Sequence, residues 1–226
     1  MRTLGITLAR GGSRGVKDKN IREVGGKPLL AWTIEQALGA ALVDEYVVST
    51  DSDRIAAVAR RYGAKVIMRP DELATDESPS IGALVHALDA CEKVYDTEYT
   101  AVADIRNTNP LKRPSDIDNC VRMLLRTGAD TVCGIERVVE YHPSRLKQMM
   151  GGNRLADVWP ELSGNRQDLR PPVYVRNGSI YVTRSTALRE GIHFMGGDIR
   201  GYLMDRGVNI DTEFDLAVAD MLLRQE

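Results

Sequence analysis

Glycines and cations alternate in one short segment near the start of the chain, positions 8 to 20, which reads Leu-Ala-Arg-Gly-Gly-Ser-Arg-Gly-Val-Lys-Asp-Lys-Asn. Gly11, Gly12 and Gly15 leave the backbone free to curl, so that successive N–H groups point into one concavity, a geometry that binds anions. The cations of the segment are Arg10, Arg14, Lys17 and Lys19, and only Asp18 opposes them. These residue types at this spacing predict a site for a polyphosphate.

Three other interpretations of the segment compete with a polyphosphate site. A glycine-rich surface turn with solvated charges has the same composition. A nucleotide-binding module without catalysis would keep the loop but would not need Lys19 and Asp211, and both residues are present. An oxidoreductase that binds a dinucleotide would suit Asp51, but it needs Gly-x-Gly-x-x-Gly, and the glycines here are spaced differently. The segment also lacks the Gly-Lys-Ser/Thr ending of a P-loop.

Composition narrows the class of protein. The chain has 226 residues, 43% of them hydrophobic and 27% charged, which is enough for one α/β domain with a sizeable core. A net charge of −2 argues against a general nucleic-acid or membrane-surface binder, and no apolar run is long enough to span a membrane. The sequence shows no signal-peptide pattern, and its cysteines, at positions 91, 120 and 133, are scattered. A cytoplasmic protein is therefore expected.

The elements that must position the loop alternate between strand and helix. Apolar patterns and helix-capping residues predict strands at 3–8, 46–50, 64–68, 100–105 and 131–135, and helices at 29–42, 54–62, 81–94 and 116–127. Asp53 and Ser80 are the expected caps of two helices, and Ser115-x-x-Asp118 is the expected capping box of a third. Such alternation predicts an α/β fold with a doubly wound, mostly parallel sheet.

The second half departs from this alternation. Residues 139–172 show no sustained period, and we interpret them as an excursion that packs on a partner subunit, the alternative being a floppy insertion. Residues 173–175 and 179–182 are expected to form a strand that passes a polar kink at Arg176-Asn177-Gly178, followed by a helix at 185–190 and a strand at 202–204. Thr212-x-x-Asp215 predicts the cap of a last helix, 213–224, whose inward residues would be Phe214, Leu216, Ala217, Met221 and Leu222.

Motifs spread over nearly the whole chain, from residue 4 to about 220, closely resemble those of the N-acylneuraminate cytidylyltransferases, or CMP-sialic acid synthetases. They are Ala9-Arg10-Gly11-Gly12-Ser13-Arg14-Gly15, Lys19-Asn20, Gly25-Gly26-Lys27-Pro28-Leu29, Val48-Ser49-Thr50-Asp51, Arg69-Pro70-x-Glu72-Leu73-Ala74-x-Asp76, Glu140-Tyr141-His142-Pro143, Arg166-Gln167-Asp168-Leu169, Arg176-Asn177-Gly178-Ser179-Ile180-Tyr181 and Ile210-Asp211-Thr212-Glu213-x-Asp215-Leu216. The matches come in the family's order.

The resemblance implies a fold, a reaction and an assembly. The fold would be that of the nucleotide-diphospho-sugar transferases, which is Rossmann-like. Residues 1–226 would form a single domain whose 139–172 excursion serves dimerisation and the acceptor site. The enzyme would transfer CMP from CTP to the hydroxyl of a sialic-acid-like 3-deoxy-ulosonic acid, release pyrophosphate and use Mg²⁺. Its partners would be these substrates and a second copy of the chain.

The resemblance also implies roles for individual residues. The catalytic residues would be Arg10, Lys19 and Asp211. The nucleotide would be bound by Leu8, Ala9, Arg10, Gly11, Gly12, Ser13, Gly15, Lys19, Asn20, Arg69, Ser78 and Ser80. The acceptor would be bound by Arg106, Thr108, Asn109, Arg145, Arg166, Gln167, Asn177 and Phe194. The metal would be held by Asp211 and Asn209.

Two positions depart from the family pattern. Arg106 stands where the family has glutamine in Leu-Gln-Pro-Thr-Ser-Pro-Leu-Arg, and Asn209 stands where it has the first aspartate of Asp-x-Asp. A cationic fork in place of an amide leaves open another ulosonic acid, a sugar phosphate or a phosphonate as acceptor, and the nucleotide could be GTP. Asp104 is interpreted as a core carboxylate rather than a second metal ligand, and His142 and His193 as structural residues.

Overall fold

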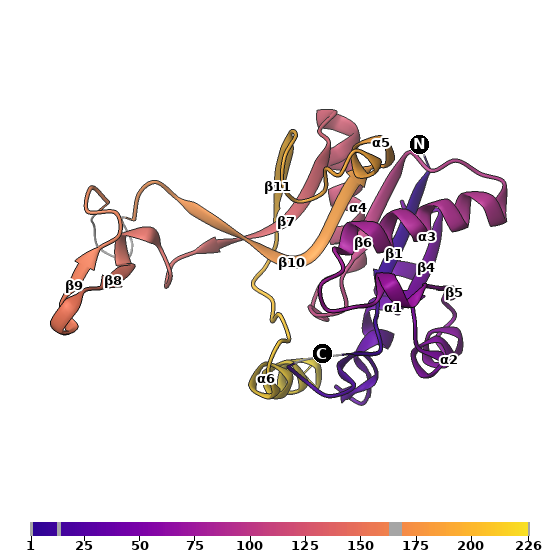
Figure 1. Cartoon of the computed structure of the whole chain (residues 1–226), viewed down its shortest axis with the longest axis horizontal. Coiled ribbons are helices and arrows are strands. Elements are labelled where there is room, and N and C mark those ends of the chain that lie inside the picture. Colours follow the sequence, from indigo (N-terminus) through magenta and orange to yellow (C-terminus); the bar gives the residue numbers. More distant parts are fainter. Residues whose placement is uncertain (1, 13–14, 163–168, 226) are drawn as a thin grey trace.

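A seven-stranded sheet forms the centre of the computed structural model, which describes residues 2–12, 15–162 and 169–225. Its strand order is β11-β7-β10-β6-β1-β4-β5 (Figure 1). These strands are β1 Thr3–Leu8, β4 Glu45–Thr50, β5 Lys65–Met68, β6 Ala101–Ile105, β7 Thr131–Val138, β10 Val173–Arg184 and β11 Ile199–Leu203. β10 runs antiparallel to β6 and β7, and the pairings β1–β4, β1–β6, β4–β5 and β7–β11 are parallel. The predicted mostly parallel sheet is confirmed.

Helices cover both faces of the sheet, as in other doubly wound folds. They are α1 Leu29–Leu38, α2 Asp53–Arg61, α3 Ser80–Tyr95, α4 Pro114–Thr127 and α5 Ser185–Arg189, and a sixth helix, α6 Glu213–Leu223, lies away from the sheet. One core cluster joins Ile34 of α1 and Ile117 of α4 to Ile105 of β6. The other joins Leu84 of α3 to Ile6 of β1. Because both faces of the central strands are buried, these strands read as continuous apolar runs in the sequence.

Helix α6 packs beneath the glycine-rich segment and not on the sheet. A third core cluster contains Val16 of that segment together with Leu216, Ala219 and Leu223 of α6. The hairpin of β2 Glu23–Val24 and β3 Lys27–Pro28 joins them, because Gly25 N donates to Asp220 Oδ1 at 2.7 Å. The C-terminal helix therefore holds residues 208–212 against the loop that follows β1.

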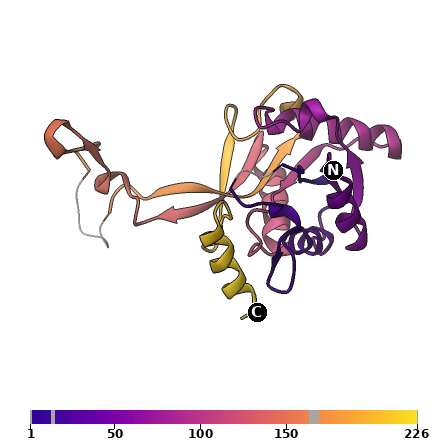
Figure 2. The ribbon, with the colours of Figure 1, turned by 60° about the horizontal axis from the view of Figure 1, so that its bottom comes forward.

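A long arm projects from the body of the protein (Figures 1 and 2). It begins where β7 and β10 run on together past the sheet, and it ends in the small sheet of β8 Lys147–Met149 and β9 Leu155–Asp157. Short 3-10 turns lie at η1 Lys19–Ile21, η2 Asp71–Leu73, η3 Pro143–Arg145 and η4 Gly151–Asn153. The described residues of the predicted excursion, 139–162 and 169–172, thus belong to an extended projection with a hairpin at its tip.

Several predicted boundaries are wrong. Helix 29–42 ends at Leu38, because the N–H of Leu42 bonds the Asp118 carboxylate at 2.8 Å. Asp118 is therefore no capping residue, and α4 starts at Pro114, where Asp116 accepts the Arg113 N–H at 2.8 Å. The strand predicted at 3–8 has the observed bounds, and the other predicted helices and strands shift by one to three residues at their ends. The strand expected to pass a polar kink is confirmed as β10, whose register shifts between Arg176 and Tyr181.

Only one of the predicted helix caps is confirmed. Asp53 and Ser80 are the first residues of their helices, preceded by Ser52 and Pro79, whereas the Thr212–Asp215 capping box is confirmed. On α6, Phe214, Ala217 and Met221 are exposed, contrary to the predicted inward face. Within the described ranges, no helix combines the length and the apolar character that crossing a membrane requires.

Candidate active site

The glycine-rich segment follows β1 at the carboxyl edge of the sheet, where open α/β sheets bind their ligands. Ala9 N donates to Ser49 O at 3.0 Å, and Gly11 N donates to Asp51 Oδ1 at 2.9 Å. Asp51 directly follows β4, so it fixes the loop from the neighbouring strand. Leu8 and Ala9 form the rigid base of the loop, and Gly12 and Gly15 are exposed above it.

Arg10 contacts a segment that the loop motif does not include. Its guanidinium lies 2.5 Å from Asp76 and donates to Thr75 O at 3.0 Å. Ser78 Oγ donates to Glu72 O at 2.6 Å, which folds this segment back on itself in front of α3. The segment 72–78 thereby reaches over Arg10, and nothing in the spacing of these residues signals that contact.

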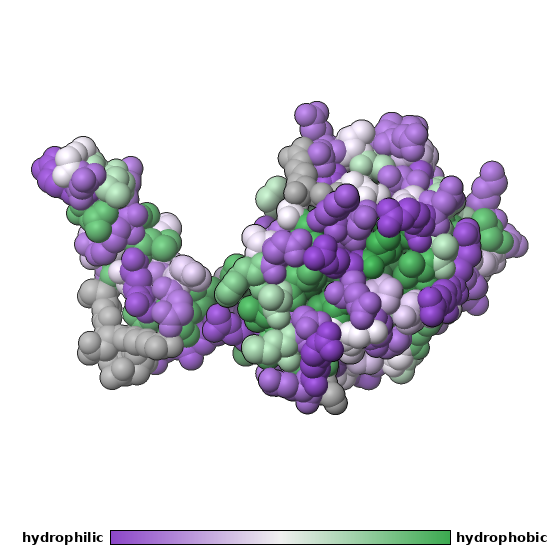
Figure 3. Space-filling model, turned by 90° about the horizontal axis from the view of Figure 1, so that it is seen from below, coloured by the Kyte–Doolittle hydropathy of each residue, from purple (hydrophilic) through white to green (hydrophobic). Residues whose placement is uncertain are grey.

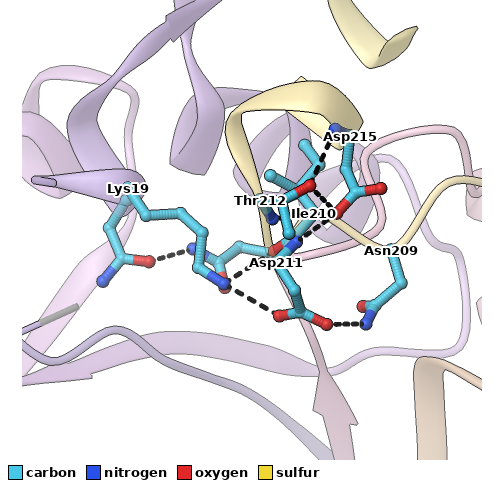
Figure 4. Close-up of polar contacts among 8 residues, drawn as sticks. Lys19, Asn209, Ile210, Asp211, Thr212 and Asp215 are labelled. Carbon is cyan, nitrogen blue, oxygen red and sulfur yellow. Dashed lines mark hydrogen bonds and ion pairs between the residues drawn. The ribbon is translucent and has the colours of Figure 1, made fainter. Parts of the chain in front are cut away.

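Lys19 and Asp211 meet although 192 positions separate them (Figure 4). Lys19 Nζ donates to Ile210 O at 2.7 Å and to Asp211 Oδ1 at 3.2 Å. Gly15 makes this approach possible, because a Cβ at that position would lie 2.0 Å from the Asp211 carbonyl oxygen. The structure therefore brings together two of the three residues predicted to be catalytic.

Asn209 and Asp211, the two predicted metal ligands, lie side by side. The Asn209 amide donates to Asp211 Oδ2 at 2.7 Å, and the Asp211 side chain is 64% exposed (Figure 4). In residues 2–12, 15–162 and 169–225, no group of three or more His, Cys, Asp or Glu side chains is arranged to hold a metal. One exposed carboxylate beside an amide oxygen nevertheless fits Mg²⁺, since this ion takes one or two carboxylates and fills its other positions with phosphate oxygens and water.

The turn after β6 ties these parts together. Asn107 Nδ2 donates to Asn20 Oδ1, and Asn20 Nδ2 donates to Arg10 O at 2.7 Å. Thr108 O accepts the N–H of Ile210 at 2.8 Å. The turn thus contacts the loop on one side and the 209–211 segment on the other, and its link through Asn107 was not predicted.

The predicted nucleoside contacts lie next to the loop. Arg69 is buried, with its guanidinium 3.4 Å from Ser49 O and from Leu73 O. Burial lowers the pKa of Arg69, and the nearby Asp51 charge opposes that shift. Ser80 is the first residue of α3 and is half-buried, just beyond the segment that contacts Arg10.

Asp104, the buried carboxylate of β6, holds the predicted acceptor residue Arg106. Arg106 Nε lies 3.0 Å from Asp104 Oδ2, and His193 Nε2 lies 3.2 Å from the same oxygen. Burial acts to raise the pKa of Asp104, but Arg106 and His193 outweigh it, so that this pKa lies below its usual value. The carboxylate is 1% exposed and faces the core. Phe194 packs beside His193, with ring centres 5.1 Å apart.

The other predicted acceptor residues divide between the arm and the buried surroundings of Arg106, whose N–H donates to Ser179 O at 2.9 Å and whose carbonyl oxygen shares the Lys112 amine with Asn109 O. Arg145 is on the arm, where it pairs with Glu140 at 3.2 Å, away from the loop of its own chain (Figures 1 and 2). Asn177 is buried and bonds Ser179 N at 3.1 Å, and Asn109 is buried beside Gly207. Ser13, Arg166 and Gln167 lie outside the described residues.

Comparisons with known proteins agree with this geometry. The family model for cytidylyltransferases matches residues 4–154. CMP-N,N'-diacetyllegionaminic acid synthase of Legionella pneumophila is 34% identical over 99% of this chain and 97% of the relative. N-acylneuraminate cytidylyltransferase of Escherichia coli is 31% identical over 96% of this chain, which spans only 52% of that relative.

Solved structures share the fold. CMP:2-keto-3-deoxy-manno-octonic acid synthetase, complexed with CTP, superposes with a TM-score of 0.75 at 19% identity, over 100% of this chain and 99% of the other. The 4-diphosphocytidyl-2C-methyl-D-erythritol synthase of Anaerococcus prevotii gives 0.62 at 15% identity, over 99% and 96%. The predicted resemblance and the predicted fold class are both confirmed.

Proposed function

Because the chain belongs to the cytidylyltransferase family, we propose that it transfers CMP from CTP to a hydroxyl group of an acidic sugar of the sialic-acid class. The observation that carries the proposal is the contact of Lys19 with Asp211 beside a glycine-rich loop. It places a cation, backbone N–H groups and a carboxylate at one edge of the sheet. A polyphosphate and its metal ion need these three kinds of group.

The residues fit the chemistry of nucleotidyl transfer. The acceptor oxygen forms a bond to the α-phosphorus, the bond to the β-phosphate oxygen breaks, and the hydroxyl proton passes to water. Negative charge develops on the departing pyrophosphate, and fixed cations stabilise that charge. Arg10 and Lys19 supply this stabilisation from the two ends of the loop, and the N–H groups between them add to it.

We further propose that Asp211 and the side-chain oxygen of Asn209 hold Mg²⁺ together with the phosphates. When bound, the ion neutralises triphosphate charge and so favours departure of pyrophosphate. The backbone N–H of Asp211 donates to Asp215 at 3.1 Å, and Thr212, the next residue, caps α6. The helix therefore fixes the backbone of the proposed metal ligand while leaving its carboxylate accessible.

The arm supports a homodimer. Figure 3 shows hydrophobic side chains at the surface of the arm. Within one chain, Met149 is 66% exposed and Leu155 is 62% exposed. A hollow of about 710 Å³ lies where the arm leaves the body, lined by residues 136–141, Val175 and 203–207. We propose a second copy of the chain as the occupant of these surfaces, with Arg145 of each arm directed to the partner's acceptor site. A cytoplasmic location is proposed from Cys91, Cys120 and Cys133, which are buried and unpaired.

Pyrophosphate release tests the function. The protein would be mixed with Mg²⁺, one of four nucleoside triphosphates, and one acceptor from a panel of sialic, legionaminic and octulosonic acids, sugar phosphates and phosphonates. We expect release only with CTP and a sialic-class acid, together with a product whose mass equals that of the CMP conjugate. Release with GTP, or only with a sugar phosphate or phosphonate, would replace the proposed substrates. No release with any pair would overturn the proposal.

A further inference from the structure

Two arginines and two aromatic rings gather beside the carboxyl end of β6. The guanidinium carbon of Arg106 lies 4.9 Å from the ring centre of Tyr181 and 5.9 Å from that of Phe194. The guanidinium carbon of Arg176 lies 4.7 Å from the Phe194 ring, and the two rings are 5.7 Å apart. We name these four residues the arginine–aromatic cluster. Its rings limit the orientations open to both guanidinium groups.

Arg106 is anchored by one nitrogen and free at the others. Its Nε donates to Asp104 at 3.0 Å, while in the part of the chain that the structure describes neither of its Nη atoms has a hydrogen-bond partner. The side chain is 32% exposed. Two parallel Nη donors form the fork that recognises a carboxylate through paired hydrogen bonds.

The anchor itself is rigid. Asp104 also faces His193, whose Nδ1 lies 3.0 Å from the Thr183 hydroxyl. Thr183 in turn accepts from Thr131 at 3.1 Å, and all these side chains are buried. A buried carboxylate is expensive unless it is paired, so this network holds Asp104 and Arg106 as one unit.

Charge identifies the ligand class. Asp104 offsets one of the two guanidinium charges, of Arg106 and Arg176, which leaves one positive charge for a ligand. Arg176 donates one Nη to Phe194 O at 3.3 Å and is exposed. A single remaining charge suits a monoanion such as a carboxylate better than a dianion such as a phosphate ester or phosphonate.

We propose that Arg106 and Arg176 bind the carboxylate of the acceptor sugar, and that Asp104 is the positioning residue that aims Arg106. This inference rests on the proposed function. It specifies which chemical group of the acceptor is recognised by Arg106, the arginine that departs from the family pattern. The adjacent Asn107 bonds Asn20, which bonds the Arg10 carbonyl. A carboxylate held by Arg106 is therefore oriented relative to the loop that binds the nucleotide.

The test compares an acidic acceptor with its methyl ester, which has the same sugar ring but no carboxylate charge. Steady-state pyrophosphate release would be measured for the wild type, Arg106→Gln and Arg176→Gln. Arg200→Gln is the control, since Arg200 is an exposed arginine paired with Asp198 at the sheet edge. We expect each cluster variant to raise the acceptor KM at least tenfold and to leave the CTP KM within twofold. The control should match the wild type.

The ratio of kcat/KM for acid over ester is the decisive quantity. It should be tenfold or more for the wild type and should fall toward one in Arg106→Gln, because that variant no longer distinguishes the two acceptors. Arg106→Lys keeps the charge but lacks the fork, so its ratio should be intermediate. Asp104→Asn should lower the ratio while the CTP KM stays unchanged, which a merely structural role for Asp104 would not do.

The outcomes separate the two proposals. If the wild type turns over the acid and the arginine variants keep its acid-to-ester ratio, the carboxylate subsite is wrong and the proposed function stands. If Arg106→Gln lowers the ratio but Asp104→Asn does not, the positioning role is wrong. If Asp104→Asn does not fold, the Arg106→Lys ratio still tests the fork. If the wild type releases pyrophosphate with none of the acidic acceptors, both the proposed function and the carboxylate subsite are wrong.

Discussion

Asn107 donates a side-chain hydrogen bond to Asn20, and both amides are buried between the turn after β6 and the loop after β1. The side-chain nitrogen of Asn20 in turn donates to the carbonyl oxygen of Arg10 at 2.7 Å. The pair therefore joins the proposed acceptor side of the site to the proposed nucleotide side.

Replacing Asn107 with alanine should loosen both halves of the site. Leaving the Asn20 oxygen unpaired in a buried place costs about 1–3 kcal/mol of stability. We expect KM to rise severalfold for CTP and for the acceptor together, with a lower melting temperature. The control is Asn119→Ala, which removes an amide in the middle of α4 that donates to the Tyr202 hydroxyl at 2.9 Å. A rise in KM in the control as well would assign the effect to general destabilisation.

Lys19→Ala tests the cation that contacts Asp211. Its amine is the only lysine nitrogen bonded to that carboxylate among the described residues, and removing it should lower kcat by at least a hundredfold, since a fixed charge near the leaving group contributes several kcal/mol. Lys17→Ala is the matched control, because Lys17 is an exposed lysine two positions earlier. Equal rates in the two variants would remove Lys19 from the mechanism. Circular dichroism would confirm that both variants are folded.

The parts of the site that could be predicted from the sequence are those fixed by local pattern. The glycines and cations that follow a buried strand indicate an anion loop, and Thr212-x-x-Asp215 indicates where α6 begins. Since the carboxyl ends of parallel strands lie at one edge, the residues that follow them meet there. That rule applies to Asp104 at the end of β6, whereas only the family resemblance predicted that Lys19 and Asp211 belong to one site.

The rest depends on tertiary contacts that no spacing reveals. By sequence, either Asp116 or Asp118 could cap the start of α4. In the structure Asp116 accepts the Arg113 N–H, and Asp118 accepts the N–H of Leu42, a contact that depends on where Leu42 lies in the fold. On α6 the buried face follows Leu216 and its neighbours one and two turns on, whereas Phe214 points outward because the loop, and not the sheet, covers this helix. The contact of Arg10 with Asp76 likewise joins segments that are far apart in the sequence.

Under the proposed function, Asp76 and the triphosphate compete for Arg10. The two side chains are 31% and 42% exposed, so the pair contributes at most about 1 kcal/mol and is screened by salt. Asp76→Asn should therefore tighten CTP binding, measured by calorimetry, by two- to fivefold, with the larger effect at low ionic strength. Asp71→Asn, an exposed neighbour on η2, is the control. Weaker CTP binding by Asp76→Asn would mean that Asp76 assists the nucleotide site.

The arm should be required for association. Leu155 lies on β9 and is 62% exposed, so a charge at this position would not disturb the fold of a single chain. In a dimer formed through the arm the same charge would be buried without a partner, at a cost of several kcal/mol. Sedimentation of Leu155→Asp should show monomers at concentrations where the wild type is dimeric. Leu125→Asp, at an exposed position of α4, should leave the oligomeric state the same as in the wild type.

Lys112 gives the stability of the protein a specific pH dependence. Its buried amine donates to Thr33 Oγ1 and Arg106 O at 2.8 Å and to Asn109 O at 2.9 Å. Burial lowers the pKa of Lys112 to about 7, although the charges of Asp104 and Asp116 oppose the shift. The unfolded chain keeps the usual lysine pKa of about 10.4, so between these values it binds a proton that the folded chain does not. Stability contributed by this group therefore rises with pH above about 7 and is constant below that pH.

Lys112→Met isolates that contribution, because methionine has similar length and does not titrate. Free energies of unfolding in urea would be measured for both proteins between pH 7 and 8.5. The upper limit avoids an opposing effect of Cys91, because burial raises the pKa of its thiol to about 12. Above about pH 8.5 the thiol of the unfolded chain loses its proton first, so this group lowers the free energy of unfolding as the pH rises. The variant should be less stable throughout, since three acceptors lose their donor. The wild-type value should rise more steeply, by up to about 1 kcal/mol per pH unit, and parallel curves would show that the buried amine stays charged.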